Sequence, residues 1–256
     1  MNRRLKFYSD TLIRWIPDRR ASILVVAGGA NDRDVLHRLG FVNVVLSNLA
    51  LNMNPADVSP FRWSRQDVEA LNYVEGEFDF VVVHAGLHHC RSPHRGLLEM
   101  YRVARKAVVA FEPPDNLAVR AMMRIGLAQT YENAAVRSND GKGGGVNNTA
   151  TPNFVYRFTE REIEKAVQSF APIAHHRFNY AYGYDEPTPE FIGKRGIKHG
   201  AVRLLMPLYR LLGLCFPKQG NLFAFRIGKP KLPEDLLPWL VVKDGIMMEG
   251  PAVRCV

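Results

Sequence analysis

Two apolar runs, each followed by a polar turn, constrain the fold of this chain more than any other feature. Residues 23–36 read ILVVAGGANDRDVL, where an apolar run leads through two glycines into a polar helix start. Residues 78–90 read FDFVVVHAGLHHC, where a second run ends in three histidines. Near-continuous valine runs suit parallel strands that are covered on both faces. The two segments therefore predict parallel strands whose carboxyl ends open onto one crevice, where ligands bind in open α/β sheets.

The rest of the pattern extends this unit into a larger sheet. Further strands are expected at 42–46, 107–111, 175–182 and 221–227, and 63–71 is expected to be a polar connection. A helix is expected to begin with Asn31 as its N-cap and Asp34 in the capping-box position; another is expected at 93–104. Alternating strands and helices indicate an α/β fold with a right-handed, doubly wound and mostly parallel sheet.

Charge and cysteine content limit the environment and the partners. The 256 residues carry a formal net charge of +9, which indicates either an anionic partner or a basic protein with no such partner. Three cysteines at irregular spacing show no disulfide framework, which favours a reducing compartment. The charged start of the chain lacks the apolar core of a signal peptide. We therefore expect a cytoplasmic protein, with peripheral membrane contact as an additional prediction.

Three segments stand out beside the predicted sheet. Residues 1–20 form an amphipathic helix whose apolar face either packs on the main domain, which is favoured, or leaves a basic surface helix. Residues 21–256 form the main domain. Within it, the Gly- and Asn-rich segment 137–152 predicts a mobile lid. A basic helical insertion is expected at 186–218, between the last two strands, and suggests a lipid-linked or polyanionic acceptor.

The segments around residues 20–116 resemble the class I S-adenosylmethionine-dependent methyltransferases. In that family, a glycine-rich turn after the first strand covers the methionine part of the cofactor. The turn here is AGGAN, residues 27–31, with Gly29 on the family's central glycine. Ala27 replaces one flanking glycine and is expected at negative φ; Asn31 replaces the other and can adopt a left-handed conformation. The resemblance implies a seven-stranded Rossmann-like sheet and S-adenosyl-L-methionine as cofactor.

The same resemblance assigns further cofactor contacts. Asn48 stands where the family usually has an acidic ribose ligand, and its amide oxygen can accept a hydrogen bond. Asp67 matches the residue that contacts the adenine amino group, and His84 ends a strand beside the cofactor. The full set of expected cofactor-binding residues is Ala27, Gly28, Gly29, Asn48, Leu49, Asp67, Val68 and His84.

Candidates for the chemistry lie at the ends of the later strands. Methyl transfer depends mainly on holding the acceptor near the methyl group, and a hydroxyl acceptor also benefits from a base. His88, His89 and Glu112 are the catalytic candidates, although a structural role for the paired histidines in shaping the turn is slightly favoured over a role as base. Histidines and a cysteine in this region could bind zinc, but no recognised second pair supports a metal. Tyr156 and Arg157 are candidate contacts for an anionic substrate.

Three classes of function remain open. The leading hypothesis is a methyltransferase, expected to O-methylate a small molecule or a glycan, including a lipid-linked one. The second is a nucleotide-sugar or dinucleotide enzyme on a similar sheet, which predicts a GxGxxG turn and an acidic residue after the second strand; this chain has neither. The third class is a catalytically weak methyltransferase-like scaffold or a membrane-surface binding protein. Nucleic acid is not an expected partner, because no recognisable module combines aromatic and basic residues. The sequence does not indicate an oligomeric state.

Overall fold

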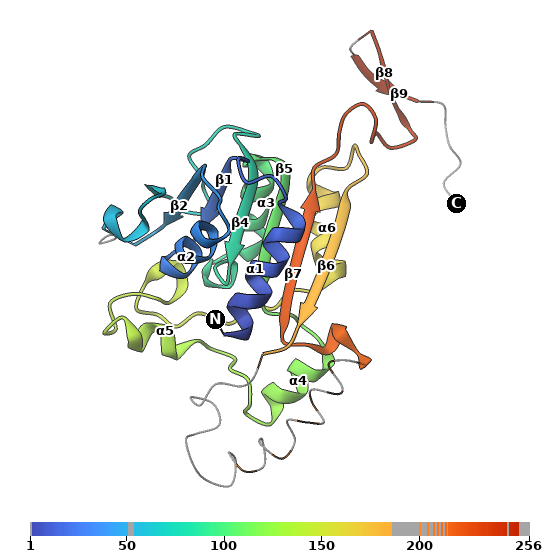
Figure 1. Cartoon of the computed structure of the whole chain (residues 1–256). Coiled ribbons are helices and arrows are strands. Elements are labelled where there is room, and N and C mark those ends of the chain that lie inside the picture. The colour runs from blue at the N-terminus through green and yellow to red at the C-terminus, as the bar shows by residue number, and fades with distance from the viewer. Residues whose placement is uncertain are drawn as a thin grey trace.

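The central feature of the computed structural model is a seven-stranded sheet with strand order β3-β2-β1-β4-β5-β7-β6 (Figure 1). The structure describes residues 2–50, 54–185, 215–244 and 246–250, together with positions 200, 204, 207, 209, 211 and 213. The strands are β1 (Ile23–Val26), β2 (Val44–Asn48), β3 (Arg62–Arg65), β4 (Phe78–His84), β5 (Ala104–Glu112), β6 (Arg177–Gly183) and β7 (Leu222–Gly228). The helices are α1 (Arg3–Trp15), α2 (Ala30–Arg38), α3 (Pro93–Val103), α4 (Leu117–Arg124), α5 (Asn133–Ser138) and α6 (Glu160–Phe170).

The sheet is parallel from β3 to β5, and β7 pairs antiparallel with both β5 and β6. The carboxyl ends of β1, β2, β4 and β5 consequently lie along one edge. This confirms the predicted doubly wound, mostly parallel sheet of seven strands. The order reverses between β1 and β4, the position at which open α/β sheets bind their ligands.

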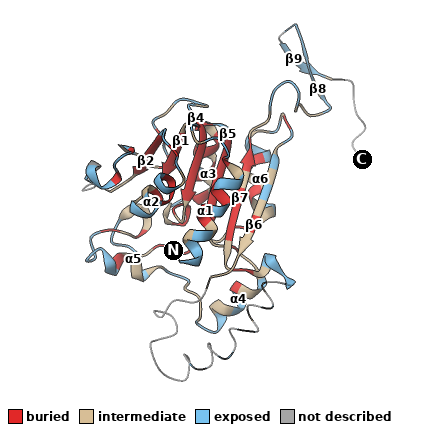
Figure 2. Cartoon of the chain, viewed as in Figure 1, coloured by how far each residue is buried: buried red, intermediate tan, exposed pale blue. Residues whose placement is uncertain are grey.

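Helices cover both faces of the sheet, as the apolar strands require. One buried cluster joins α3 and α6 to the sheet, and a second joins α1 and α2 to the opposite face. Figure 2 shows that the central strands are buried along their length. In α1, Tyr8 and Leu12 are fully buried, which confirms that this amphipathic helix packs on the domain. Burial of one such apolar side chain contributes about 1.5–3 kcal/mol.

Several predicted boundaries are corrected by the structure. Residues 62–65 form the edge strand β3, although they were predicted to belong largely to a polar connection. Their sequence, RWSR, has no apolar strand pattern, because this strand is defined by its backbone pairing with β2. Helix α2 is capped by Gly29 instead of Asn31, with Asp32 accepting from the Gly29 N–H. The hairpin formed by β8 (Leu240–Lys243) and β9 (Ile246–Glu249) was not predicted; Figure 1 shows it projecting from the main body.

The expected helical insertion at 186–218 falls largely outside the described residues. Among the residues that are described, no helix combines the length and apolar character needed to cross a membrane.

Candidate active site

The turn after β1 is tightly built, and its backbone explains the two glycines. A Cβ at Gly28 would lie 2.9 Å from Leu46 Cδ2, so this position excludes any side chain. The Gly28 N–H donates to the Ser47 carbonyl at 2.8 Å, which joins the turn to β2. A Cβ at Gly29 would meet nothing within 4 Å, so the turn presents open space there.

Ala27 departs from expectation. Its φ is +52°, in the left-handed region, whereas the sequence interpretation required a negative φ. Asn31, which was expected to supply left-handed freedom, lies inside α2. The chain must reverse immediately after β1, before Gly28 packs against β2, so the unusual conformation falls on the alanine. A non-glycine residue in this region costs roughly 1–2 kcal/mol.

A first cavity opens at the carboxyl ends of β1, β2 and β4. It brings together five predicted cofactor residues, which are Ala27, Asn48, Leu49, Asp67 and Val68. Ala85, Gly86 and His89 from the turn after β4 form another wall. Gly28, Gly29 and His84 do not line this cavity.

The Asn48 side chain bridges two backbone segments. Its Nδ2 donates to the Gly28 carbonyl at 3.2 Å, and its Oδ1 accepts from the Ala50 N–H at 3.2 Å. The amide therefore ties the end of β2 to the glycine turn while it faces the first cavity. An aspartate, the family's usual residue, could accept the second bond but could not donate the first.

The predicted lid segment forms the remaining wall of the first cavity. Gly144, Gly145, Asn147 and Asn148 all line it. The Asn147 Oδ1 accepts from the Arg91 N–H at 3.1 Å, which joins the segment to the turn after β4. This is the position that a lid would occupy; its movement stays a prediction.

A second cavity adjoins the carboxyl ends of β4 and β5 on the side of α1. His84 and Glu112 line it, together with apolar side chains from α1, α4 and β7. Two arginines also face it, Arg4 and Arg157. The cavity thus combines apolar walls with two arginines and two acidic residues, Glu112 and Asp185.

His84 belongs to this second cavity because it packs under α1. Its ring stacks on Tyr8 with centroids 4.4 Å apart, and its Nδ1 lies 3.8 Å from Asp32 Oδ1. Burial lowers the pKa of His84 to about 3, with the charge of Arg4 acting in the same direction. His84 is therefore a neutral aromatic wall at neutral pH.

Tyr156 and Arg157, the two predicted substrate contacts, point to different sides of the chain. The Tyr156 hydroxyl donates to Glu162, and Tyr156 lines neither cavity. Arg157 lines the second cavity and donates to the carbonyls of Val155 and Gln129 at 2.9 and 2.6 Å. Its Nε is buried and has no hydrogen-bond partner among the described residues. Neighbouring side chains in extended chain face opposite ways, so only one of the pair can reach the site.

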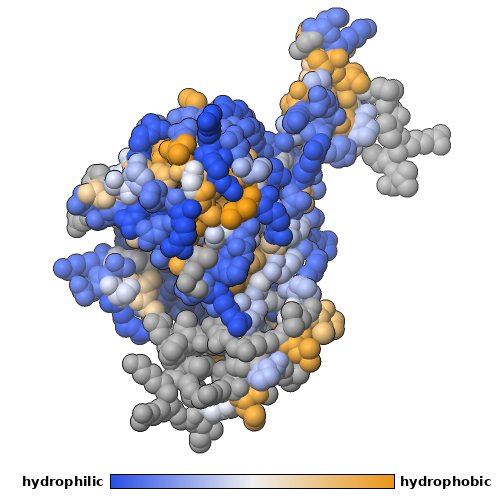
Figure 3. Space-filling view, in the orientation of Figure 1, coloured by the Kyte–Doolittle hydropathy of each residue, from blue (hydrophilic) through white to orange (hydrophobic). Residues whose placement is uncertain are grey.

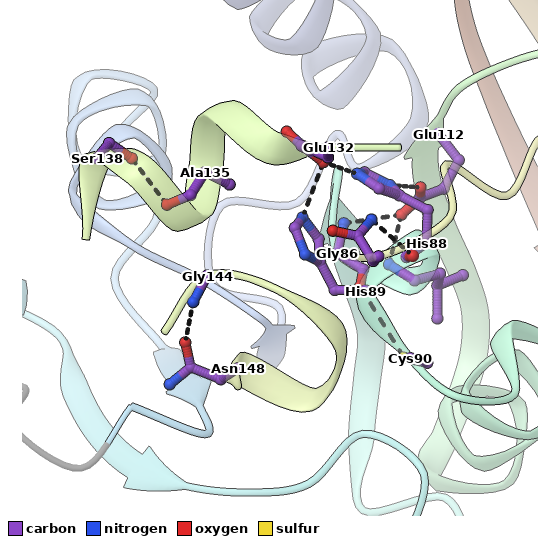
Figure 4. A network of polar contacts seen from close by, with 12 residues as sticks. Gly86, His88, His89, Cys90, Glu112, Glu132, Ala135, Ser138, Gly144 and Asn148 are labelled. Atoms are coloured by element: carbon purple, nitrogen blue, oxygen red, sulfur yellow. Dashed lines mark hydrogen bonds and ion pairs between the residues drawn. The ribbon is translucent and has the colours of Figure 1, made fainter. Parts of the chain in front are cut away.

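The catalytic candidates form a buried network around Glu112 (Figure 4). Glu112 Oε1 accepts from the N–H groups of Gly86 and Leu87 at 2.8 and 2.7 Å. Its Oε2 lies 2.7 Å from His88 Nδ1. The other ring nitrogen of His88 lies 3.2 Å from Glu132 Oε2, and His89 Nε2 lies 3.4 Å from the same oxygen.

This network gives the two histidines different charges. Burial opposes the imidazolium form of His88, but Glu112 and Glu132 outweigh it and raise the pKa to about 9. A histidine that is protonated at neutral pH cannot accept a proton, so the geometry favours the structural role for His88. Burial and the His88 charge lower the pKa of His89, and only His89 of this pair lines the first cavity.

Glu132 and Asp32 are site residues that the sequence interpretation missed. Glu132 lies 44 positions from His88 in the sequence and belongs to no recognisable motif. Asp32 is buried beside the glycine turn, and burial raises its pKa to about 6. Its position three residues after Gly29 is the signal that could have found it, because an acidic residue there completes a capping box.

Comparisons with known proteins agree with this geometry. Residues 27–111 match a family model described as a methyltransferase domain. The fold is similar to that of a SAM-dependent methyltransferase of Thermotoga maritima, which is described as a possible histamine N-methyltransferase. The TM-score is 0.52 and the sequence identity 11%, and the match covers 88% of this chain and 89% of that chain. The fold is also similar to a SAM-dependent methyltransferase of Archaeoglobus fulgidus, with a TM-score of 0.51 and 10% sequence identity. The match covers 88% of this chain and 94% of that chain.

A third similar structure is a putative methyltransferase of Haloferax volcanii in complex with the Trm112 methyltransferase activator, with a TM-score of 0.54, 10% identity, and coverage of 88% and 89%. Among curated proteins, none matches this chain significantly.

The sheet order, the glycine turn and the family match define a methyltransferase domain. Residues 27–111 therefore form a methyltransferase domain, and the fold of the chain is similar to that of S-adenosylmethionine-dependent methyltransferases.

The two hydrogen bonds of Asn48 predict the effect of Asn48→Asp. The carboxylate loses the bond to the Gly28 carbonyl and faces that oxygen with a negative charge. We expect a stability loss of about 1 kcal/mol and weaker binding of S-adenosylhomocysteine, measured by thermal unfolding and calorimetry. This reverses the simpler expectation that an acidic residue tightens binding to the ribose. Tighter binding by the variant would show that the ribose contact dominates.

Proposed function

We propose that the first cavity holds S-adenosylmethionine and that the second holds a small amphipathic acceptor, which is methylated on oxygen. The observation that carries this proposal is that the two cavities are adjacent at the end of β4. His84 lines the second cavity, and the next residue, Ala85, lines the first. A cofactor extending from Asp67 past Ala27 would approach the boundary between the two cavities. Bound in the first cavity, S-adenosylmethionine would supply an electrophilic methyl group to an acceptor oxygen held in the second cavity.

The residues at the turn suit the cofactor in particular ways. Open space above Gly29 leaves room for the methionine part, and Asn48 and Asp67 face the cavity where the ribose and adenine would lie. Asp32 is buried beside the turn and accepts from the Gly29 N–H, so it can hold the turn in shape for the cofactor. Glu112 and His88 act as positioning residues, because they hold the turn after β4.

The acceptor class follows from the second cavity. Its walls include Phe7, Val119 and Met122, which favour an apolar body over a glycan. Arg157 offers a buried, unpartnered Nε–H, which suits a carboxylate or phosphate. A small molecule with an apolar body and one anionic group matches both features.

The Gly29→Val variant tests the cofactor site. A Cβ at this position meets no protein atom within 4 Å, so the added side chain is expected to interfere mainly with a bound ligand. We expect wild-type protein to bind S-adenosylhomocysteine in calorimetry and the variant to lose at least ~30-fold in affinity, or about 2 kcal/mol. Thermal unfolding serves as the control for folding. Failure of the wild type to bind would overturn the cofactor assignment. Equal binding by Gly29→Val would show that the turn at Gly29 does not contact the cofactor.

The Arg157→Gln variant tests the acceptor site. Removal of a charged donor is expected to raise KM for carboxylate or phosphate acceptors ~10–100-fold, in line with the 1.5–3 kcal/mol of a charged hydrogen bond. Affinity for S-adenosylhomocysteine should remain unchanged. Release of S-adenosylhomocysteine across a panel of apolar acids provides the assay, and Arg161→Gln, an exposed arginine on α6, is the matched control. Unchanged KM values would contradict the anionic acceptor.

Contact with a membrane surface is part of the same proposal. Helix α4 turns Val119 and Met122 toward the second cavity and leaves Leu117 73% exposed, with Ile125 at its end 65% exposed. Figure 3 shows small apolar spots at the lower right of the molecule, the part in which Figure 1 places α4. An amphipathic acceptor could enter from a lipid surface beside this helix.

Co-sedimentation with phosphatidylglycerol vesicles tests this contact. We expect Leu117→Glu to reduce the bound fraction several-fold, because a charge replaces an apolar contact with lipid. Val74→Glu changes an equally exposed apolar residue elsewhere, with 70% exposure, and should leave the bound fraction unchanged. Equal binding of both variants and the wild type would place any membrane contact away from α4.

A further inference from the structure

We propose that His88, His89 and Glu132 form a binding site for a divalent transition-metal cation of the zinc class. The two Nε2 atoms and a Glu132 carboxylate oxygen converge, and these ligand atoms all lie within 4.8 Å of one another. Figure 4 shows both rings directed at the Glu132 carboxylate. The site joins the turn after β4 to the residue that precedes α5.

The separations between the ligand atoms fit a tetrahedral ion. Glu132 Oε2 lies 3.2 Å from His88 Nε2 and 3.4 Å from His89 Nε2. Bond lengths of ~2.0–2.1 Å to zinc place tetrahedral ligands roughly 3.3 Å apart. Charge-assisted hydrogen bonds are shorter, at about 2.7–2.9 Å. The two separations from Glu132 therefore lie closer to the spacing of neighbouring ligands on a tetrahedral ion than to that of a short charge-assisted hydrogen bond.

The surroundings of His88 match those of a metal ligand. Histidines that bind metals commonly donate the other ring N–H to a carboxylate, which fixes the ring. Here His88 Nδ1 lies 2.7 Å from Glu112 Oε2, and the Glu112 side chain is fully buried. The N–H groups of Gly86 and Leu87 hold Glu112 in turn. His88 Nε2 is thereby aimed at the proposed ion, which would displace the proton that this nitrogen carries in the metal-free protein.

The donor set indicates both the ion and its coordination. Two imidazoles and one carboxylate favour zinc-class ions over Mg²⁺ or Ca²⁺, which prefer all-oxygen ligands. Three protein ligands leave a fourth position open, as in catalytic rather than structural zinc sites. His89 lines the first cavity, which provides a route for the ion to enter. A bound ion would supply a Lewis acid beside the cofactor cavity.

The experiment uses the full-length protein after treatment with EDTA. Zn²⁺ is titrated by calorimetry, and Co²⁺ is added as a spectroscopic probe, because its visible absorption distinguishes tetrahedral coordination. We expect one equivalent of Zn²⁺ to bind and Co²⁺ to give intense tetrahedral bands. Glu132→Gln and His89→Gln should each weaken binding at least 30-fold and abolish those bands.

His94→Gln is the matched control. His94 also pairs with a glutamate, since its Nε2 lies 2.6 Å from Glu162 Oε1, but it is not part of the three-ligand cluster. This variant should bind Zn²⁺ as the wild type does. Absence of stoichiometric binding in the wild type, or binding by Glu132→Gln equal to that of the wild type, would overturn the site.

Two further measurements keep the outcomes distinct. Circular dichroism and thermal unfolding establish that each variant is folded, and His89→Gln, at a half-buried position, serves where Glu132→Gln is unstable. Binding of S-adenosylhomocysteine is measured on the same metal-free samples. We expect the wild type to bind S-adenosylhomocysteine both with and without Zn²⁺. A protein that binds S-adenosylhomocysteine but not Zn²⁺ would therefore contradict the metal site and leave the cofactor site intact.

Discussion

The buried carboxylate of Glu112 is the interaction on which the rest of the site depends. It stands at the end of β5 and accepts two backbone N–H groups from the turn after β4, together with His88. Desolvation opposes a buried negative charge, but the charge of His88 and these hydrogen bonds lower the pKa of Glu112 below its ordinary value. Removal of one partner from such a buried pair typically costs 3–5 kcal/mol. The carboxylate thereby fixes the turn that separates the two cavities.

The same network extends to the segment that closes the first cavity. His88 meets Glu132, and the His88 carbonyl accepts from Asn153 Nδ2 at 3.0 Å. The Asn153 carbonyl accepts from the Glu132 N–H at 2.9 Å. Residues on both sides of the predicted lid at 137–152 are therefore tied to the turn after β4. These contacts connect the histidine cluster to the segment that lines the first cavity.

The site also separates charged from neutral groups over short distances. His84 and His88 lie four positions apart, yet burial against Tyr8 keeps the first neutral while two carboxylates keep the second protonated. The difference arises from the elements packed on each ring, because α1 offers an aromatic face and the segment before α5 offers a carboxylate. Identical residue types thus serve as an apolar wall in one place and as a charged anchor in the other.

Alternation of apolar runs and polar turns determined the α/β sheet, the carboxyl-end crevice and the methyltransferase resemblance, because buried parallel strands impose that pattern locally. It also placed Asn48, Asp67 and His89 near the strand ends, and all three line the first cavity. Tertiary structure alone decided the left-handed φ of Ala27, the strand at 62–65 and the opposite directions of Tyr156 and Arg157. It alone brought Glu132 to the two histidines. Such contacts depend on how distant segments pack, and no local periodicity records that packing.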